Sequence, residues 1–278
     1  MKYTFYIIVF LVSFSNLVTA QTFEWVRTSE VLEFEKSVVD ETGNLYVTGW
    51  EFVLLKYDGN GVPMWTICPE SDTKNMDIVI SDDGFIYVGG FFSGALQLGS
   101  TELISDYGYS FFLAKFAQNG NVIWAKKLNE YGVNTSIQMA IDNNSNIILS
   151  GSTTDSLIID TINIFQYEGV GFISKYNSSG NLIWSRLVGN YDTSSNGFRA
   201  IYDVAVMPDN NLLIAGEFGY SFAIDSLTLI NSNHSDGFIA KYSENGNFIW
   251  AIPYGINGGG VVNSIIAAGD NGGFYLAS

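Results

Sequence analysis

The chain has 278 residues, of which 47% are hydrophobic and 15% aromatic, and its formal net charge is −16. Such an acidic surface repels phosphate backbones and anionic lipid head groups, so nucleic acid is not an expected partner. Cys68 is the single cysteine and His234 the single histidine. An internal disulfide is therefore excluded, and zinc sites and Ser-His-Asp triads are disfavoured. A Cys68–His234 pair stays open by number alone, but nothing in the local sequence supports it.

Residues 1–20 have the pattern of a secretory signal peptide. Lys2 precedes a short apolar run from Phe5 to Val12, and Ala20 provides a small residue for cleavage. The run is too short for a convincing membrane span, and no later segment is apolar for long enough either. We expect cleavage after Ala20 and a mature chain without a membrane span, secreted or held at the outer cell surface. A retained N-terminal anchor is the alternative.

One short motif recurs four times along the mature chain. In each copy a lysine is followed five residues later by a glycine, and a tryptophan stands four residues after that glycine. From tryptophan to tryptophan the spacings are 59, 60 and 66 residues. The members are Lys56, Gly61 and Trp65; Lys115, Gly120 and Trp124; Lys175, Gly180 and Trp184; and Lys241, Gly246 and Trp250. Fixed offsets at a regular period indicate one structural unit per copy.

A second element keeps step with the first. An acidic or Asn-rich turn precedes a short apolar strand that ends in glycine, at 44–49, 84–89, 146–151 and 211–216. Another apolar strand stands before each turn, as at 76–80 and 204–207. Short β-branched and aromatic runs between Gly, Asn and Asp turns are typical of antiparallel hairpins. The sequence shows no sustained helical periodicity, so we predict an all-β chain.

Four strands per period, repeated, predict a β-propeller of four-stranded antiparallel blades. One such sheet has two faces and cannot cover both alone, whereas blades packed around an axis bury them and limit exposed edges. A parallel β-helix or an α-solenoid fits the period and the strand pattern less well. A sandwich with accidental self-similarity is the alternative fold.

At this point the sequence resembles the bacterial SBBP-type β-propeller repeat, whose blades carry a similar Lys-Tyr … Gly-Asn-x-x-Trp segment. Residues 236–251, "DGFIAKYSENGNFIWA", match it most closely, followed by 171–185 and 111–125. The likeness covers about residues 23–278. The Gly-x-x-x-Trp turn is also similar, more distantly, to the tryptophan-docking repeats of quinoprotein-like propellers. The resemblance implies a bacterial envelope or extracellular protein, and it says little about a ligand.

The predicted propeller domain occupies residues 21–278. Residues 23–27 mimic the tryptophan strand and are expected to be a stray closing strand; blades follow at 35–69, 72–130, 133–191 and 197–255, with a partial fifth at 261–278. The first blade is short, and the later ones carry an insertion that looks like a small extra hairpin. Four blades and a fraction make an incomplete ring, so we interpret the chain as a fragment of a longer protein. An open array, or a ring closed by another chain, is the alternative.

The repeated residues are more easily explained by structure than by chemistry. A catalytic residue is needed once and not once per blade, so the four lysines are expected to cover apolar surface with their stems, although a ring of cations for an anion is the other interpretation. The tryptophans are expected to pack between blades. Asp and Asn in the turns favour turn geometry; Ca²⁺ binding there is the alternative, and we expect no other cofactor or metal.

Two sets of residues could act on a polysaccharide. Carboxylates paired across a propeller face could hydrolyse glycosides, but no motif singles out a pair among Glu33, Glu35, Glu51, Glu102, Glu130, Glu168 and Glu217. Aromatic rings outside the repeat could stack on sugars, namely Tyr107, Tyr109, Tyr131, Tyr167, Tyr191 and Tyr220. We identify no catalytic residue and predict a monomeric binding or structural module for an extracellular protein or polysaccharide. A polysaccharide-acting glycosidase or lyase is the alternative.

Overall fold

The computed structural model describes residues 6–7, 27–28, 34–49, 51–128, 134–153, 157–159, 162–164, 170–189, 198–219, 221–230, 236–255, 265–269 and 272–277. These residues form strands and turns without any helix, which confirms the predicted all-β class. Most of the predicted signal peptide and residues 23–26 lie outside the described residues. Of these segments, β1 (Tyr6–Ile7) and β2 (Arg27–Thr28) form a two-residue antiparallel pair.

Four antiparallel four-stranded sheets follow one another along the chain, as expected for propeller blades. The first holds β3 (Phe34–Val39), β4 (Leu45–Gly49), β5 (Val53–Tyr57) and β6 (Pro63–Ile67). The second holds β7 (Asp72–Ile80), β8 (Ile86–Leu98), β9 (Thr101–Phe116) and β10 (Val122–Lys127). The third holds β11 (Asn134–Ile141), β12 (Ile147–Thr153), β15 (Val170–Tyr176) and β16 (Leu182–Val188). The fourth holds β17 (Phe198–Val206), β18 (Leu212–Phe218), β21 (Asp236–Tyr242) and β22 (Phe248–Tyr254).

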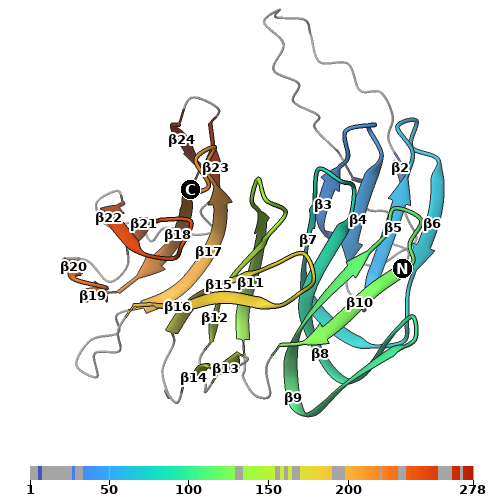
Figure 1. The fold of residues 1–278 in the computed structure, drawn as a ribbon, viewed down its shortest axis with the longest axis horizontal. Coiled ribbons are helices and arrows are strands. Elements are labelled where there is room, and N and C mark those ends of the chain that lie inside the picture. Colours follow the sequence, from blue (N-terminus) through green and yellow to red (C-terminus); the bar gives the residue numbers. More distant parts are fainter. Residues whose placement is uncertain are drawn as a thin grey trace, which may run out of the picture.

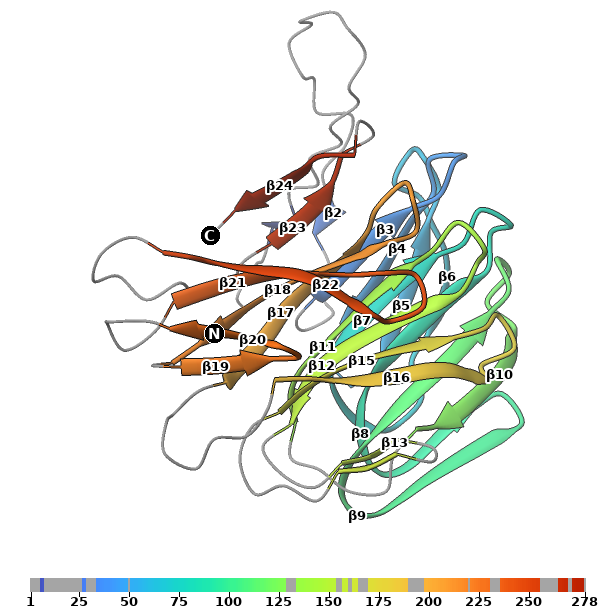
Figure 2. The same ribbon diagram turned by 60° about the vertical axis from the view of Figure 1, so that its left-hand side comes forward.

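A fifth sheet has two described strands, β23 (Ile265–Ala268) and β24 (Phe274–Ala277). The predicted fold, about four blades with part of a fifth, is thereby confirmed. The sheets follow one another in chain order around an arc, from the blue first blade to the dark red fifth hairpin (Figures 1 and 2). The first strands of consecutive sheets contact one another, β3 with β7, β7 with β11, β11 with β17 and β17 with β23, so these strands line the axis.

The insertions of the later blades form the extra hairpins that the sequence predicted. In the third blade β13 (Leu157–Ile159) pairs with β14 (Ile162–Ile164), and in the fourth β19 (Ser221–Ile224) pairs with β20 (Leu227–Ile230). In the second blade β8 and β9 continue instead past a register shift at Ser93 and Gly94 into one long hairpin. All three extensions leave the blade between its second and third strands.

The hydrophobic cores lie between neighbouring blades. Successive residues of a strand point to opposite faces of its sheet, so each second strand supplies two cores. In β8, Ile86 and Val88 join the core shared with the first blade, whereas Tyr87 joins the core shared with the third. In the same way β12 sends Ile147 to the second blade and Ile148 to the fourth. The second and third blades therefore each contribute to a core on both of their faces.

The outer hairpin of each blade turns tightly at the repeated glycine. In the third blade the Gly180 amide donates to the Asn177 carbonyl, and the Asn177 amide donates to Asn181. Gly180 has φ +71°, a left-handed conformation that glycine adopts without steric cost. The strand pairing shifts register beside the turn, between Lys175 and Tyr176, as a bulge requires. The other outer hairpins turn in the same way at Gly61, Gly120 and Gly246.

Candidate functional site

The repeated lysine and tryptophan of one blade bind the outer turn of the next blade. The Trp184 indole donates to the Glu244 carbonyl at 3.1 Å, and the Lys175 ammonium donates to the same carbonyl at 3.3 Å. The first and second blades repeat the arrangement: Lys56 and Trp65 donate to the Gln118 carbonyl, and Lys115 and Trp124 donate to the Ser178 carbonyl. We call this pair of hydrogen bonds to one turn carbonyl the latch.

The repeated glycine lies against the tryptophan of the preceding blade. A Cβ at Gly180 would stand 2.8 Å from the Trp124 ring, and a Cβ at Gly246 would stand 2.8 Å from the Trp184 ring. A Cβ at Gly120 would approach Trp65 to 3.3 Å. The tryptophans are half-buried, so they seal the outer part of each blade junction while the cores fill its inner part. The geometry thus uses these residues as joints between blades.

The aspartates of the acidic turns accept hydrogen bonds from backbone amides of the same turn. Asp40 accepts hydrogen bonds from the amides of Thr42 and Asn44 and from the Tyr46 hydroxyl. Burial by itself would raise the pKa of Asp40, but hydrogen bonds from Asn44, Thr42 and Tyr46 outweigh it and lower that pKa to about 2. Among the described residues no three His, Cys, Asp or Glu side chains are grouped to hold a metal ion. Ca²⁺ binding at these turns stays the untested alternative to a purely structural role.

Asp142 shows how the turn and the repeated lysine combine. Its carboxylate accepts the amides of Asn144 and Asn146 and pairs with the Lys175 ammonium at 2.7 Å. Burial tends to raise the pKa of Asp142, and the bonds from Lys175 and Asn146 lower it overall. Lys175 therefore neutralises a carboxylate of its own blade and donates a hydrogen bond to the turn of the next blade. Its ammonium has partners on both blades, which differs from the ring of free cations that the sequence left open.

Polar side chains from the first strands of four blades converge at the axis. Each stands four residues before the first residue of the blade's acidic turn: Lys36, Asp77, Gln138 and Asp203. The Lys36 ammonium donates to the Gln138 side-chain oxygen at 3.3 Å, which joins the first blade to the third. The charge of Lys36 also acts on both Asp77 and Asp203. We call these four residues the axial cluster.

The two axial carboxylates also fasten neighbouring blades. Asp77 accepts the Ile78 amide at 2.8 Å and the Met139 amide of the third blade at 2.7 Å, one on each oxygen. Asp203 accepts the Val204 and Ile266 amides in the same way, both at 2.9 Å. At the remaining junctions Glu35 accepts the Met76 amide and the Ser152 hydroxyl oxygen accepts the Ile201 amide. Every described blade junction thus has one side-chain bond to the next inner strand.

Burial shifts the axial carboxyls toward the protonated form. Desolvation raises the pKa of Asp77 to about 6, against the opposing effects of the Lys36 charge and the amides of Met139 and Ile78. The nearby charge of Asp203 adds to the rise. Desolvation also raises the pKa of Asp203, opposed by the amides of Ile266 and Val204 and by Lys36. Both axial carboxyls, close to a lysine, therefore hold a proton up to a higher pH than an ordinary aspartate does.

The axial cluster was absent from the sequence-based candidates, although a signal for it exists. A polar residue recurs at the same repeat position of the first strand in all four blades. Of the acids proposed from the sequence, Glu35 lies at a blade junction and Glu217 accepts the Tyr202 hydroxyl, while Glu51 and Glu102 are exposed elsewhere. Glu33, Glu130 and Glu168 lie outside the described residues. No pair forms among these acids within the part of the chain that the structure describes.

Tyr109 is the one sequence-proposed sugar-stacking ring whose side chain the structure describes. Its hydroxyl donates to Asp72 at 2.8 Å, and the Lys74 ammonium covers its ring at 3.6 Å from the centroid. One face of the ring is therefore occupied. Side chains of the other tyrosines lie outside the described residues, as does His234, while Cys68 is exposed and free. A Cys68–His234 pair is not tested.

Comparisons with known proteins agree with a repeat protein. No family model matches the chain. An uncharacterized WD repeat-containing protein of Acanthamoeba polyphaga mimivirus is 29% identical over 197 residues, which are 58% of this chain and 14% of that protein. The chain therefore spans about one seventh of the length of this curated relative. The SBBP-type family stays a prediction, and the propeller fold follows from the blade topology itself.

Similar solved structures come from varied proteins. The quinohemoprotein alcohol dehydrogenase of Comamonas testosteroni has a TM-score of 0.46 and 14% identity, covering 76% of this chain and 33% of its own. A protein of unknown function from Bacteroides caccae has a TM-score of 0.42 and 10% identity, and the match covers 83% of this chain and 85% of that protein. The GH43 BlXynB protein of Bacillus licheniformis has a TM-score of 0.41 and 10% identity, and the match covers 88% of this chain and 48% of that protein. Likenesses at this level carry no functional argument. Among the described residues, no helix has the length and apolarity that crossing a membrane requires.

Proposed function

We propose that the protein is a secreted or cell-surface β-propeller that acts as a binding and structural interaction module for an extracellular protein or polysaccharide. The residue pattern of 1–20 supports export, and the acidic surface disfavours polyanionic partners. The fold supports the module, because blade loops and outer strands present a large surface on a rigid frame. The name of the mimiviral relative, a WD repeat-containing protein, is consistent with such a role.

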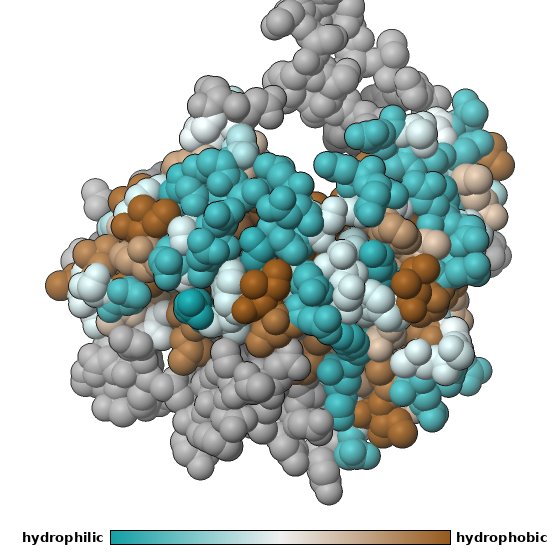
Figure 3. Space-filling view, viewed as in Figure 1, coloured by the Kyte–Doolittle hydropathy of each residue, from teal (hydrophilic) through white to brown (hydrophobic). Residues whose placement is uncertain are grey.

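One observation carries the proposal. The residue before each repeated tryptophan is apolar and about half exposed on the outermost strand of its blade: Met64 at 56%, Ile123 at 51%, Ile183 at 50% and Ile249 at 47%. Single exposed apolar residues need no explanation, but the same position in four blades forms a regular row. Figure 3 shows brown apolar areas separated by teal polar surface on the viewed face. We call these four side chains the rim row.

The rim row gives the experiment. A variant with Ile123→Ser, Ile183→Ser and Ile249→Ser is compared with wild type for binding to a panel of immobilised extracellular proteins and polysaccharides. The matched control carries Asn121→Ser and Asn247→Ser, at exposed positions of the same hairpins. The proposal expects a ligand whose binding falls at least tenfold in the rim variant and stays within twofold in the control. Ligand binding that is the same in wild type and the rim variant, or detection of the protein only inside the cell, would contradict the proposal.

The axial cluster favours a second candidate, an enzyme that acts on an extracellular polysaccharide. A pair of carboxyls, with a pKa raised by burial, is the chemistry that a glycosidase uses. Against this candidate, both oxygens of Asp77 and of Asp203 already accept backbone amides. A polysaccharide-degradation assay on wild type, Asp77→Asn and Asp203→Asn separates the two. Activity that each single substitution abolishes, while the variants stay folded, would establish the enzyme and overturn the purely structural role.

A further inference from the structure

The second blade carries a polar cluster at the base of its long hairpin. Asp72, Ser93 and Tyr109 are paired in register on β7, β8 and β9, directly before the shift at which the hairpin extension begins. The Oδ2 atom of Asp72 accepts hydrogen bonds from the Ser93 hydroxyl at 2.7 Å and from the Tyr109 hydroxyl at 2.8 Å. The Lys74 ammonium lies 3.6 Å from the centroid of the Tyr109 ring. We call these four residues the hairpin cluster.

The hairpin cluster has no counterpart in the other blades. Five residues before the axial position, where the second blade has Asp72, the others have an apolar residue: Val31, Val133 and Phe198. Six residues before the latch lysine, where the second blade has Tyr109, the others have Trp50, Gly169 and Ser235. Residues that join blades recur from blade to blade, whereas a binding residue is needed once. The hydrogen bonds of the cluster stay within one blade, so blade assembly does not explain them.

The surface around the cluster is open. Its aspartate is exposed, and its other three side chains are partly exposed. Gly94 and Gly108, next to Ser93 and Tyr109, both have φ +68°, and a Cβ at either glycine would meet nothing within 4 Å beyond its chain neighbours. Residues 106–108 are left out of the strand pairing, as in a β-bulge, and bulges often redirect side chains beside a binding site. A ligand can therefore approach both the side chains and the backbone here.

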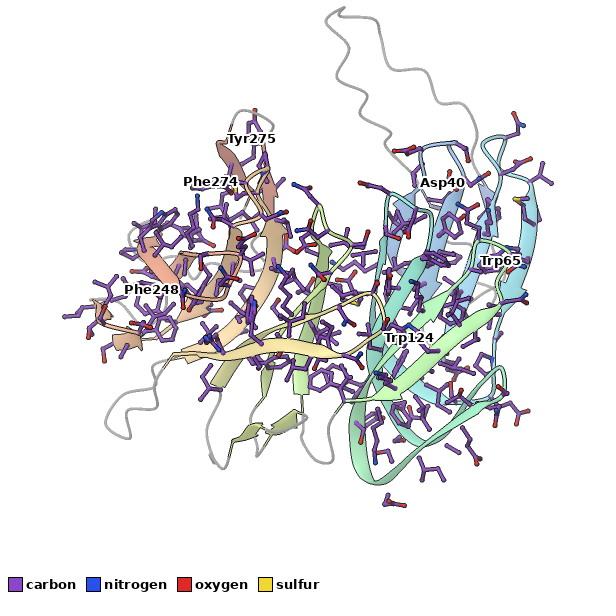
Figure 4. All side chains as sticks on the ribbon, viewed as in Figure 1. Asp40, Trp65, Trp124, Phe248, Phe274 and Tyr275 are labelled. Carbon is purple, nitrogen blue, oxygen red and sulfur yellow. The ribbon has the colours of Figure 1, made fainter. Side chains whose placement is uncertain are left out.

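The cluster lies at a different part of the blade from the rim row. The hairpin of β8 and β9 extends beyond the other strands of its blade (Figures 1 and 2). In Figure 4, Trp124 marks the outer strand β10, which carries the rim-row residue Ile123, and the hairpin extension reaches below it. Binding at the two places can therefore be separated by substitutions.

The cluster offers one acceptor and one donor that the described protein groups leave available. Among the described residues, the Oδ1 atom of Asp72 accepts no hydrogen bond, and the Lys74 ammonium donates none. Hydrogen bonds from Ser93 and Tyr109 lower the pKa of Asp72, burial opposes them, and the Lys74 charge adds to the lowering. The carboxyl is therefore ionised and accepts at both oxygens, while the ammonium has three protons to donate.

We propose that the hairpin cluster binds a neutral glycan through two adjacent hydroxyl groups of one sugar ring. One hydroxyl donates to the Oδ1 atom of Asp72 and its neighbour accepts from the Lys74 ammonium, since each hydroxyl can do both. Ser93 and Tyr109 hold the carboxylate in place before the ligand arrives, which reduces the entropy lost on binding. An ionic ligand fits less well, because it would meet a like charge beside the opposite one. The inference rests on the proposed extracellular binding role and adds a ligand class and a second site to it.

The test uses the whole chain and three soluble neutral polysaccharides. Dextran and yeast mannan carry adjacent free hydroxyls on their sugar rings, whereas the linkage of a linear β-1,3-glucan separates the free hydroxyls of its chain residues. Calorimetric titration is expected to show that dextran or mannan binds at least tenfold more tightly than the β-1,3-glucan. Equal affinity for all three polysaccharides, or no binding of dextran and mannan, would overturn the inference.

Variants of the protein assign the site. Asp72→Ala and Lys74→Met are each expected to weaken the binding of dextran or mannan at least fivefold. The matched controls are Asp82→Ala and Lys127→Met, which change an exposed aspartate and a partly exposed lysine of the same blade and should leave binding within twofold. Circular dichroism melting checks that each variant is folded. Polysaccharide binding that survives both cluster substitutions contradicts the inference.

The triple rim-row variant separates this inference from the proposed function. It should bind dextran or mannan within twofold of wild type, because the hairpin cluster is intact in it. Polysaccharide binding that the rim-row variant loses and the cluster variants keep would overturn the inference and assign the glycan to the rim row. Rim-dependent binding of an immobilised extracellular protein, with no binding of any polysaccharide, would overturn the inference and support the proposed function.

Discussion

Gly180 meets two requirements that can be separated by experiment. Its φ of +71° disfavours any side chain, and its Cα faces the Trp124 ring so closely that a Cβ would stand 2.8 Å away. Gly43 has φ +83° with nothing within 4 Å of an added Cβ. The conformational penalty is common to both positions, and the clash belongs to Gly180 alone.

We expect Gly43→Ala to lower the free energy of unfolding by about 1–2 kcal/mol, the cost of a left-handed side chain. Gly180→Ala should lower it by roughly 1–3 kcal/mol more, since the latch must yield to the added methyl group. Urea unfolding followed by tryptophan fluorescence measures both. Equal losses for the two variants would show that the contact between glycine and tryptophan contributes nothing.

Asp77 should make stability depend on pH in the opposite sense to most carboxylates. Its pKa rises from 3.8 to about 6 on folding, mainly through desolvation, so the native state binds more protons than the unfolded state between these values. The stabilising contribution is complete below about pH 4 and is lost as the pH rises through 6. A shift of roughly two pKa units corresponds to about 3 kcal/mol.

The measurement compares wild type with Asp77→Asn at several pH values. The asparagine side chain cannot titrate, so the stability difference between the two proteins should move in favour of wild type by up to about 3 kcal/mol as the pH falls from about 7 to about 4. Asp82→Asn, on the exposed turn of the same blade, is the matched control. A difference that does not change over this range would refute the protonation of the axial cluster.

At the scale of elements, the β23–β24 hairpin is held by one side-chain bond at its inner strand. Asp203 accepts the Ile266 amide, and Ile266 fills the core shared with the fourth blade. Asp203→Ala should raise the hydrogen-exchange rate of the Ile266 amide about tenfold, which is the loss of one charge-assisted bond. Exchange in β7 and β11, whose junction uses Asp77, should stay unchanged. An unaltered rate at Ile266 would mean that packing alone holds the hairpin.

The sequence was informative about elements because each blade repeats the same local rules. The offsets from Lys175 to Gly180 and Trp184 reflect a turn and a bulge, both local, so the strands and the fold could be predicted. The acceptor of Trp184 could not, because the Glu244 carbonyl lies 60 residues away and backbone carbonyls carry no sequence signal. The axial cluster depends on four strands meeting in space, and only a comparison of repeat positions would have revealed Lys36 and its partners.

At the scale of the whole molecule, the strand contacts between described blades join neighbours, and only the bond from Lys36 to Gln138 links the first blade to the third. Stability is therefore close to a sum of blades and junctions. Trp124→Ala removes a latch donor and a ring from the junction of the second and third blades. Loss of the half-buried ring should lower the free energy of unfolding by roughly 2–4 kcal/mol, somewhat less than the loss of a fully buried aromatic residue. We expect wild type to unfold in one calorimetric transition and Trp124→Ala in two. One transition that merely shifts to lower temperature would show that cooperativity does not pass through this junction.

The one-way latch also bears on how such a molecule can change in evolution. The lysine and tryptophan of each blade bind the following blade, and its glycine turn accepts bonds from the preceding blade. The contact is the same at each junction, so it does not distinguish one blade from another. A duplication of one period, about 60 residues, would therefore insert a blade whose two new junctions are copies of existing ones. Blade number is free to vary by whole units, whereas an insertion of half a period would leave both donors and turns without counterparts.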